Sequence, residues 1–486
     1  MPEMENAAVN MEARNEIIEQ RYKNLQELEK AGIYPFGERF PDVETVESLK
    51  KDFSEGREIR AAGRIMAKRI MGKSIFMDLK DFTGRIQLYV KKDTVGEEAF
   101  RILKVLDIGD IIGVNGKLFK TKTGEETVQV ADYRIMTKSL YPLPEKWHGL
   151  KDVEARYRQR YVDLIVNDSA REIFRTRIRM IARMREYLNS KGFLEVETPM
   201  MQPIPGGAAG KPFKTHHEAL DMDLFLRIAP EIYLKKLLVG GFDKVYEINR
   251  SFRNEGISTR HNPEFTMVEI YEAYSDCGGM MRLTEELIRH MAREVLGTEK
   301  FVYQDREVDL SYWKRVSFAE LMKENFGISK DDPLDAWVKK LKSKGIEIEG
   351  DKVSKTQLIN IVGDLVEPKE EIHPVFVVDM FKELSPLAKE KKGEPGITDR
   401  FELFMGGIEI ANAYSELNDP IEQRKRFIEQ AKEDPEARID EDFIKALEYG
   451  MPPAGGLGIG IDRLTMILTN SPSIREVILF PQMRPE

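Results

Sequence analysis

A strongly charged loop between two alternating segments is the feature that most restricts how this chain folds. Residues 242–274 read FDKVYEINRSFRNEGISTRHNPEFTMVEIYEAY. Apolar and polar residues alternate on both sides of the loop, and this period of two predicts two antiparallel strands. On the second strand, Phe265, Met267, Glu269 and Tyr271 would share one face, because successive side chains of a strand point to opposite sides. The hairpin therefore offers an aromatic ring, an acid and a phenol together.

The loop itself adds charged groups that suit an anionic ligand. It contains Arg253, Glu255, Arg260, His261 and Glu264. A guanidinium group matches the oxygens of a phosphate or a carboxylate. The order FRNE, then TRHNPEFT, then an acid on the following strand resembles the second signature motif of class II aminoacyl-tRNA synthetases, in the form of the lysyl-tRNA synthetases. A solvated hairpin with surface ion pairs would not need this order.

Length and charge agree with a large globular protein that contains two or three domains. The chain has 486 residues and a net charge of −9, from 75 basic and 84 acidic residues, which argues against non-specific coating of nucleic acid but allows a local basic groove. The single cysteine, Cys277, excludes an internal disulfide and a thiolate zinc cluster. No apolar run approaches the ~20 residues of a membrane span, and the acidic start is not a signal peptide. We expect a cytoplasmic protein without a membrane part.

The N-terminal third predicts a helical segment and then a small barrel. Residues 1–56 include a helix over 12–31 that would pack on the neighbouring domain, with Gly32 as its stop; its apolar stripe is Ile17, Ile18, Tyr22, Leu25 and Leu28. Residues 57–140 hold five β-rich runs, with a helical stretch between the third and the fourth, and this order is typical of an OB-type barrel.

Barrels of this type also bind sugars or proteins, so the pattern alone does not give a ligand. The segment RIMGKSIFMDLKDFTGRIQLYV resembles the anticodon-reading domain of the lysyl-tRNA synthetases. The resemblance implies a face that stacks and hydrogen-bonds single-stranded bases of tRNA(Lys). Its candidate residues are Lys68, Arg69, Phe76, Gln87 and Glu125.

A Pro- and Gly-rich linker at 141–152 separates the barrel from a catalytic domain at 153–486. Residues 171–190 predict a helix that Gly192 caps; the apolar stripe is Phe174, Ile178, Ile181, Met184 and Leu188. With GFLEVETPMM after it, this helix resembles the first class II motif, which ends at Pro199 and builds a homodimer interface. Residues 300–370 predict a helical insertion.

Two further segments resemble the family's amino-acid site. In LRIAPEIYLKKLLVGG, Glu231 lies in the first helical turn. A helix-start acid often serves only the helix dipole, but APE followed by YL resembles the family's site for the α-amino group. In PIPGGAAGKPF, Gly206, Gly207 and Ala208 permit close approach to a ligand, although a flexible turn fits them equally well.

The C-terminal part predicts a hairpin that carries acids. Gly406–Gly407 suits a two-residue turn, and pairing around it puts Glu402 and Glu409 on one face. Two neighbouring carboxylates repel each other unless a cation lies between them. Mg²⁺ bound with ATP phosphates fits this position, because it keeps waters and takes one or two protein carboxylates.

The same hairpin continues with Asn412, Tyr414 and Glu416. Under strict alternation these three fall on the face opposite Glu409, so a site that uses both sets needs a bulge or a sharp twist around residues 411–413. They resemble the lysyl family's pocket, in which an asparagine, an aromatic residue and a glutamate surround the side-chain ammonium group of lysine.

The last segment, GGLGIGIDRL, is rich in glycine but lacks the Gly-Lys-Ser/Thr of a phosphate-binding Walker loop. It resembles the third class II motif, a strand under the nucleotide followed by a helix that presents Arg463 to a phosphate. Asp462 would either orient this arginine or cap the helix.

All three motifs occur in order, so the chain resembles a lysyl-tRNA synthetase over about residues 57–486. The implied fold is α+β, with an OB barrel and an antiparallel sheet flanked by helices, in a homodimer. The resemblance implies lysine activation with ATP and Mg²⁺ and transfer to tRNA(Lys). It assigns catalysis to Arg253, Glu255 and Arg463, and ATP binding to these three with His261 and Phe265. It assigns L-lysine to Gly207, Glu231, Arg253, Glu269, Tyr271, Asn412, Tyr414 and Glu416, and the metal to Glu402 and Glu409.

Two other functions fit parts of the sequence. A lysyltransferase acting on elongation factor P is similar from the first motif onward but lacks the barrel, so residues 57–137 argue against it. A catalytically inactive RNA-binding relative would not need Arg253, Arg463, Glu402 and Glu409.

Overall fold

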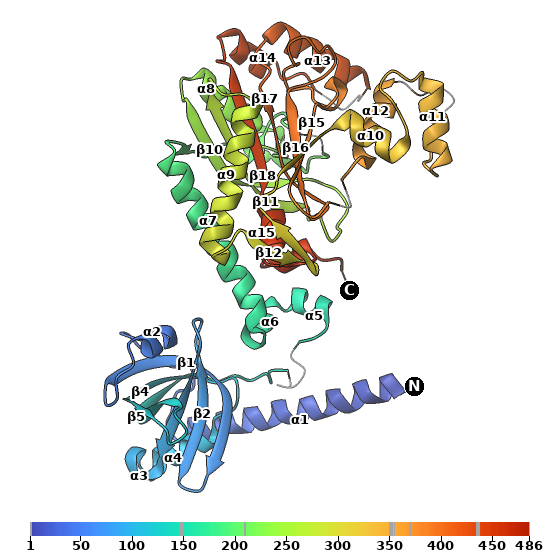
Figure 1. Cartoon of the computed structure of the whole chain (residues 1–486). Coiled ribbons are helices and arrows are strands. Elements are labelled where there is room, and N and C mark those ends of the chain that lie inside the picture. Colours follow the sequence, from blue (N-terminus) through green and yellow to red (C-terminus); the bar gives the residue numbers. More distant parts are fainter. Residues whose placement is uncertain are drawn as a thin grey trace. The chain divides into compact units, whose positions relative to one another are not determined.

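The chain folds into two compact units, Met1–Leu150 and Lys151–Glu486. A computed structural model (Figure 1) describes residues 2–144, 150–208, 210–348, 353, 355–368, 371–433 and 438–485. Each unit has its own buried apolar core.

A closed five-stranded barrel forms the first unit, in the strand order β1-β2-β3-β5-β4 (Figure 1). Only β3 and β5 pair in parallel. The elements are β1 Glu58–Met71, β2 Ser74–Lys80, β3 Arg85–Lys91, α3 Lys92–Val95, α4 Glu97–Val105, β4 Ile111–Lys120 and β5 Glu126–Thr137. The two helices lie between the third and fourth strands, so the predicted OB-type barrel is confirmed.

The N-terminal helix α1 (Pro2–Lys30) packs on this barrel through its C-terminal part. Leu28 is fully buried in the barrel core. Arg21 is also buried and donates to the backbone carbonyls of Ile108 and Ser139. The predicted apolar stripe is only partly correct, since Ile17 and Tyr22 are exposed. A short helix, α2 (Val46–Lys51), adds Val46 and Leu49 to the same core.

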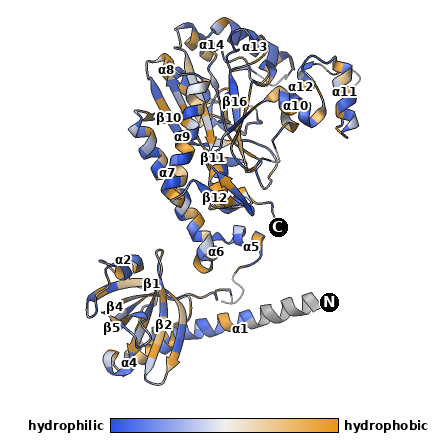
Figure 2. Ribbon diagram, in the orientation of Figure 1, coloured by the Kyte–Doolittle hydropathy of each residue, from blue (hydrophilic) through white to orange (hydrophobic). Residues whose placement is uncertain are grey.

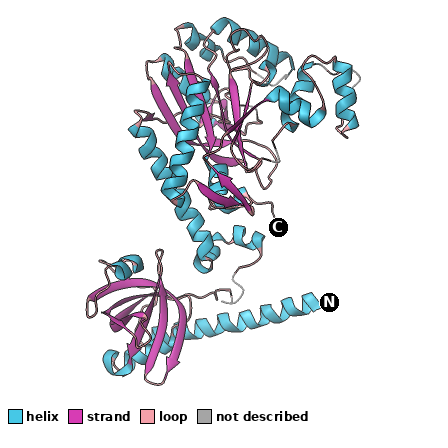
Figure 3. Ribbon diagram, viewed as in Figure 1, coloured by secondary structure: helices cyan, strands magenta, loops and turns pink. Residues whose placement is uncertain are grey.

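An eight-stranded mixed sheet is the centre of the second unit, as the strands of Figure 3 show. Only the outermost pairs, β14–β15 and β10–β6, are parallel. In spatial order the strands are β14 Lys314–Ser317, β15 Val375–Val378, β16 Arg400–Met405, β17 Ile408–Ser415, β18 Ala454–Gly460, β11 Glu264–Ala273, β10 Lys244–Phe252 and β6 Leu194–Glu195. The alternating residues of 242–274 thus form the predicted antiparallel hairpin, β10 with β11.

Smaller strands and several helices surround this sheet. The remaining strands are β7 Met201–Gln202, β8 Lys214–His217, β9 Met222–Leu226, β12 Lys300–Tyr303 and β13 Arg306–Asp309. The helices are α5 Val153–Arg158, α6 Arg160–Val166, α7 Asp168–Ser190, α8 Glu231–Val239, α9 Cys277–Leu296, α10 Phe318–Phe326, α11 Leu334–Ser343, α12 Lys355–Leu365, α13 Pro420–Glu433, α14 Glu441–Glu448, α15 Ile461–Leu468 and α16 Ile474–Val477.

Helices α7, α9 and α15 cover one face of the sheet and leave the other face for a site. Met184 of α7 and Met291 of α9 are fully buried against Val268 of β11 and Leu457 of β18. Hydrophilic and hydrophobic residues alternate along α7 and α9 (Figure 2). One residue of the predicted α7 stripe, Ile178, is 61% exposed in this unit.

The predicted helical insertion is correct only between β14 and β15. There, α10, α11 and α12 pack around the buried Trp337 in a core to which β14, β15 and β16 contribute Val316, Val377 and Phe404. Residues 300–317 instead form the strands β12, β13 and β14. Their charged residues alternate with buried ones such as Val308 and Val316, a period of two that belongs to strands. In the described part of the chain, no helix is long and apolar enough to cross a membrane.

Candidate active site

A strand without side chains on one face forms the floor of the candidate site. Gly456, Gly458 and Gly460 of β18 point away from the core, whereas the alternating Leu457 and Ile459 are buried in it. Because β18 lies between β17 and β11, the missing side chains leave a trough in the middle of the sheet.

The two neighbouring strands provide the walls of this trough. On β11, Met267, Glu269 and Tyr271 lie directly opposite Gly460, Gly458 and Gly456. On β17, Asn412 lies opposite Gly458, and Tyr414 lies opposite Gly456. Directly opposed residues of paired strands share a face. The face predicted for β11 therefore exists, and it faces a second wall from β17.

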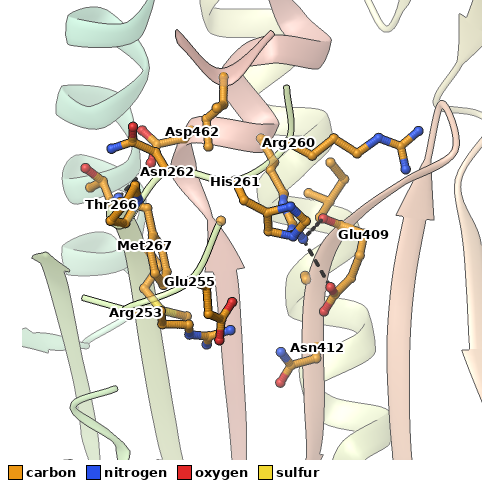
Figure 4. Close-up of a pocket in the computed structure, with 18 of the residues that line it drawn as sticks. Arg253, Glu255, Arg260, His261, Asn262, Thr266, Met267, Glu409, Asn412 and Asp462 are labelled. Atoms are coloured by element: carbon orange, nitrogen blue, oxygen red, sulfur yellow. Dashed lines mark hydrogen bonds and ion pairs between the residues drawn. The ribbon is translucent and has the colours of Figure 1, made fainter. Parts of the chain in front are cut away.

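One end of the trough opens into a cavity that contains seven of the predicted residues. Figure 4 shows Arg253, Glu255 and Met267 on one side of this cavity, with Glu409 and Asn412 across from them. The predicted residues that line it are Arg253, Glu255, His261, Phe265, Glu409, Asn412 and Arg463.

A bulge brings both sets of hairpin residues to this face. Gly406 and Gly407 have φ values of 60° and 70°, which a two-residue turn with positive φ requires. Glu409 then pairs with Phe404, but the next pair is Leu403 with Ala411, which leaves Ile410 as an extra residue. Asn412 consequently shares the face of Glu409 and pairs with Glu402. The predicted bulge is present, just before residues 411–413.

At the open end, Arg463 is held by two predicted neighbours. Its Nη1 donates to the backbone carbonyl of Glu409 at 2.9 Å and to Oε2 of Glu409 at 3.1 Å. Its Nη2 lies 3.2 Å from Nε2 of His261, whose Nδ1 is 3.0 Å from the Ser258 hydroxyl. Burial and the positive charge of Arg463 lower the pKa of His261. A neutral imidazole that accepts at Nε2 and donates from Nδ1 fits these contacts.

The role of Asp462 differs from both alternatives drawn from the sequence. Its Oδ2 accepts from the backbone N–H of Thr266 in β11 at 2.7 Å, and its Oδ1 lies 2.5 Å from Nη1 of Arg177 in α7. The carboxylate is 2% exposed. Asp462 therefore neither orients Arg463 nor caps α15; it joins α15 to β11 and α7.

Arg253 occupies the boundary between the open cavity and the trough. Its guanidinium carbon lies 5.2 Å from the centre of the Phe265 ring, a cation–π contact on one face of that ring. Burial lowers the pKa of Arg253, and the carboxylates of Glu409 and Glu255 oppose this shift. Gly210 runs so close that a Cβ atom there would lie 3.0 Å from Cδ of Arg253. The glycine-rich loop thus reaches the site.

The opposite end of the trough is a buried pocket of acids and phenols. Tyr414 donates to Oε1 of Glu231 at 2.7 Å, and Tyr271 donates to Oε2 of Glu269 at 3.1 Å. Glu416 is 1% exposed. Burial raises the pKa of Glu416 to about 8 and that of Glu269 well above its ordinary value. Acids buried this deeply either take up a proton or pair with a cation.

The loop glycine Gly207 lies beside this pocket. Its φ of +87° is one that side chains rarely adopt, and an added Cβ would lie 2.9 Å from Cβ of Glu231. The backbone at Gly207 is therefore packed closely against the start of α8, and the approach of a ligand to this loop stays a prediction.

Lys235 is a member of this pocket that was not predicted from the sequence. Its ammonium group lies 2.6 Å from Oε1 of Glu231 and 2.5 Å from Oε2 of Glu416, and its side chain is fully buried. The spacing of four residues between Glu231 and Lys235 on one helix was the available signal.

The two predicted metal ligands, Glu402 and Glu409, lie near each other but each already pairs with an arginine. Arg400 donates to Oε1 of Glu402 at 2.7 Å. Burial raises the pKa of Glu402 to about 7; Arg400 opposes this, whereas Glu409 and Glu367 add to it. Among the described residues, no group of three or more His, Cys, Asp or Glu side chains is placed to hold a metal ion.

On the barrel, an aromatic row includes the predicted Phe76. Phe76 and Tyr89 stack at 4.8 Å between ring centres, and Tyr89 lies 5.9 Å from Phe119. Tyr89 and Phe119 were not among the residues predicted from the sequence. Arg69 lies directly opposite Phe76 in the ladder.

Thr127 contacts two further predicted barrel residues, Gln87 and Glu125. Its hydroxyl is 3.1 Å from Oε1 of Gln87 and 3.1 Å from the backbone carbonyl of Glu125. Glu125 itself is exposed in the turn before β5.

Lys68 does not belong to this face, and its predicted role is wrong. It pairs with the buried Met77 rather than with Phe76, because neighbours in a strand point to opposite sides. Its ammonium group donates to the backbone carbonyls of Leu103, Lys104 and Leu106. It thus satisfies free carbonyls at the end of α4.

Comparison with known proteins accounts for both units. A model described as tRNA synthetases class II (D, K and N) matches residues 152–484, and one described as an OB-fold nucleic acid binding domain matches residues 59–142. The chain belongs to the class II tRNA synthetases. The β18 trough thus lies within the matched synthetase region, and the aromatic row lies within the matched nucleic-acid-binding region.

Several curated relatives of this synthetase match it over nearly its whole length. A lysine–tRNA ligase of Pelotomaculum thermopropionicum is 56% identical over 483 residues, which cover 97% of this chain and 95% of that protein. One of Carboxydothermus hydrogenoformans is 54% identical, covering 97% and 98%. One of Thermoanaerobacter sp. is 52% identical, covering 98% of each. These alignments include the barrel.

The glycine floor gives a first testable prediction for this synthetase. In Gly456→Ala, the new Cβ would lie 1.8 Å from Oε1 of Glu416 and 2.6 Å from the Tyr271 ring. Glu416 must then move, and the KM for the activated amino acid should rise at least about tenfold, which is ~1.4 kcal/mol. The measurement is the amino-acid dependence of ATP–pyrophosphate exchange.

Gly458→Ala is the matched control, since the closest atom to its Cβ would be the flexible end of Met267, at 3.1 Å, with Glu269 and Asn412 at ordinary contact distances of 3.9 and 4.0 Å. It should raise this KM less. Equal values for the two variants would contradict the close packing of Glu416 against β18.

Proposed function

We propose that this synthetase is a lysine–tRNA ligase, which activates lysine with ATP and transfers it to tRNA(Lys). The observation that carries the amino-acid specificity is the acid pocket at the closed end of the trough, with Glu231, Glu269 and Glu416 all at least 95% buried. A substrate with two ammonium groups supplies the cations that such a pocket requires. Aspartate or asparagine would call for a basic or amide pocket instead.

Within the pocket, we assign the two ammonium groups to different acids. Glu231, beside Gly207 and at the start of α8, would receive the α-ammonium group. Glu416 would receive the side-chain ammonium group, which passes between Asn412 and Tyr414 on β17 and Tyr271 on β11. Arg253, at the boundary with the cavity, would bind the lysine carboxylate.

The cavity at the open end would bind ATP. Phe265 offers the ring face that Arg253 does not cover to the adenine, and His261 and Glu255 line the space where a bent triphosphate would lie. Arg463 would bind the terminal phosphate after exchanging its contact with Glu409. Arg253 would bridge the α-phosphate and the lysine carboxylate, since a guanidinium fork matches both.

Magnesium is the cation that fits Glu402 and Glu409. Their donor atoms are carboxylate oxygens, and the raised pKa of Glu402, caused by burial and by neighbouring acids, indicates a surplus of negative charge. When bound with ATP, Mg²⁺ neutralises phosphate charge while taking only one or two protein carboxylates. Glu409 would release Arg463 to the phosphates as it turns to the cation.

The chemistry then needs no side chain as a nucleophile. The lysine carboxylate attacks the α-phosphorus of ATP, the bond to the pyrophosphate oxygen breaks, and lysyl-adenylate and pyrophosphate form. The terminal ribose hydroxyl of the tRNA next attacks the acyl carbon and AMP leaves. The trough contributes by holding the reactants in line and by neutralising charge with Arg253 and Arg463.

Two partners complete the proposal. The barrel face would read anticodon bases by stacking on the aromatic row. A second copy of the chain would cover exposed apolar residues on α7, β6 and β7, where Ile178, Leu194 and Met201 are 61%, 55% and 53% exposed. We place the enzyme in the cytoplasm, where its tRNA substrate is and where the thiol of Cys277 stays reduced.

The specificity prediction concerns all twenty amino acids. Lysine alone should support rapid ATP–pyrophosphate exchange, because its two ammonium groups match the buried acids. The measurement is exchange with each amino acid at equal concentration. Faster exchange with aspartate or asparagine would overturn the assignment.

The metal prediction concerns Glu409→Gln. The amide cannot replace the anionic ligand, so the Mg²⁺ concentration for half-maximal exchange should rise about tenfold, which is ~1.4 kcal/mol. Glu272→Gln, on the same sheet but paired with Lys244, is the control. A lower rate with an unchanged magnesium midpoint would show that Glu409 acts through Arg463 and not through the metal.

The anticodon prediction concerns Phe76→Ala. Loss of a stacking ring should weaken tRNA binding by roughly 1–3 kcal/mol, while lysine-dependent exchange, which needs no tRNA, stays unchanged. Phe82→Ala, in the exposed turn before β3, is the matched control. Aminoacylation of matched and anticodon-altered tRNA decides the role, since equal losses on both would mean that Phe76 reads no base.

A further inference from the structure

The buried ammonium group of Lys235 lies where the two ammonium-binding acids of the proposed lysine pocket meet. It contacts one oxygen of each, Oε1 of Glu231 and Oε2 of Glu416, at 2.6 and 2.5 Å. It also lies 5.5 Å from the centre of the Tyr414 ring. A single side chain therefore fixes both acids and faces the ring between them.

These contacts leave the second oxygen of each acid for another partner. Oε1 of Glu416 is buried, and no hydrogen-bond donor in the described structure reaches it. This oxygen points at β18, where only the absence of a side chain at Gly456 makes room for it. Glu416 is thus held by Lys235 on one side and presents an open acceptor toward the trough on the other.

Charge balance favours a permanent role for this lysine. The three acids Glu231, Glu269 and Glu416 carry up to three negative charges. Arg253 and Lys235 contribute two positive charges. The pocket would then carry one net negative charge, which matches lysine, whose two ammonium groups and one carboxylate sum to +1. Without Lys235 the buried excess would be two charges, and a buried acid avoids such an excess by taking up a proton.

We propose that Lys235 is a positioning residue for lysine recognition, an internal counter-ion that holds Glu231 and Glu416 in place and turned toward the substrate. This inference rests on the proposed lysine pocket and goes beyond it, because Lys235 itself would not touch the reacting atoms. The substrate uses the free oxygens, and Lys235 keeps its own contacts throughout.

The electrostatics of the neighbouring elements agree with this role. Burial would lower the pKa of Lys235, but Glu231 and Glu416 more than offset it and raise the pKa above its ordinary value. The charged or titratable groups facing Glu416 are Lys235 and Glu231 of α8, Tyr414 of β17, and Glu269 and Tyr271 of β11, with Arg400 of β16 next to Tyr414. Among those that act on Glu416 itself, Lys235 is the one that lowers its pKa, which is already about 8.

A competing role for Lys235 predicts the opposite change in lysine binding when this residue is removed. If Lys235 were a pseudo-substrate that competes for the acids, its removal would tighten lysine binding. If it is a counter-ion, its removal raises the pKa of Glu416 further and weakens lysine binding most where Glu416 is mostly neutral. A group whose folded pKa is raised to about 8 is mostly neutral at pH 7 and ionises above pH 8. The weakening should therefore be greatest near pH 7 and smaller at pH 8.5.

The test is Lys235→Met in the full-length enzyme, measured by ATP–pyrophosphate exchange. The KM for lysine should rise by about tenfold or more at pH 7, the equivalent of one pKa unit, with the KM for ATP unchanged and a smaller rise at pH 8.5. Lys236→Met is the matched control: Lys236 is the next residue of α8 but pairs with Asp442 on the surface. An unchanged or lower KM for lysine in Lys235→Met would overturn the proposal.

Chemical rescue separates positioning from a purely structural role. In Lys235→Ala, added propylammonium ion should lower the KM for lysine toward the wild-type value, whereas 1-propanol, its neutral counterpart, should not. Equal effects of the two additives would overturn the counter-ion role. If Lys235→Met does not fold, Lys235→Arg decides, since it keeps the buried charge but moves it: the KM for lysine should rise with kcat unchanged, and a wild-type KM would contradict positioning.

A Glu416→Gln variant distinguishes an incorrect pocket from an incorrect role for Lys235. If its KM for lysine equals the wild-type value, the proposed pocket itself is wrong. If Glu416→Gln loses lysine binding while Lys235→Met does not, the pocket stands and only the role of Lys235 is wrong.

Discussion

The buried carboxylate of Asp462 is the contact on which the geometry of the trough depends. It accepts from the Thr266 backbone and pairs with Arg177, and so joins the start of α15 to β11 and α7. Because β18 leads directly into α15, this contact fixes where the glycine strand ends and where Arg463, the next residue, leaves the helix. Removing one partner of a buried pair leaves an uncompensated charge, at a cost of several kcal/mol. Asp462 therefore holds together residues of all three family motifs, although these motifs lie far apart in the sequence.

A fixed glycine strand explains why the walls carry so much unusual chemistry. Side chains on the central strand of a sheet would normally fill the face above it. Here Gly456, Gly458 and Gly460 leave that face open, so β11 and β17 can direct acids and phenols toward each other across it. The cost is a set of buried carboxylates with raised pKa values, which a core of ordinary packing would not tolerate.

Local periodicity predicted most of the elements, and the resemblance predicted seven of the nineteen residues that line the cavity. The hairpin of β10 and β11, the barrel and the Gly406–Gly407 turn all arise from patterns within one or two strands. The errors arise where a side chain's partner is distant in sequence. Lys68 binds carbonyls at the end of α4, and Asp462 binds Thr266 and Arg177. Lys235 was not predicted, because an i,i+4 pair on a helix is usually a surface feature. Only the fold shows that this lysine is buried against Glu416.

The two ends of the trough differ in charge, and this difference sets the direction in which a substrate lies. Arg253, Arg463 and His261 line the cavity near Gly460, whereas Glu416 and Tyr271 pack against Gly456. Four residues of extended strand separate these glycines, roughly 13 Å, so the positive and negative side chains of the trough lie well apart. A reversed substrate would place a carboxylate among buried acids and an ammonium group beside arginines. In the proposed site, orientation would follow from the charge gradient along β18 without a moving part, because each end would reject the group that the other end binds.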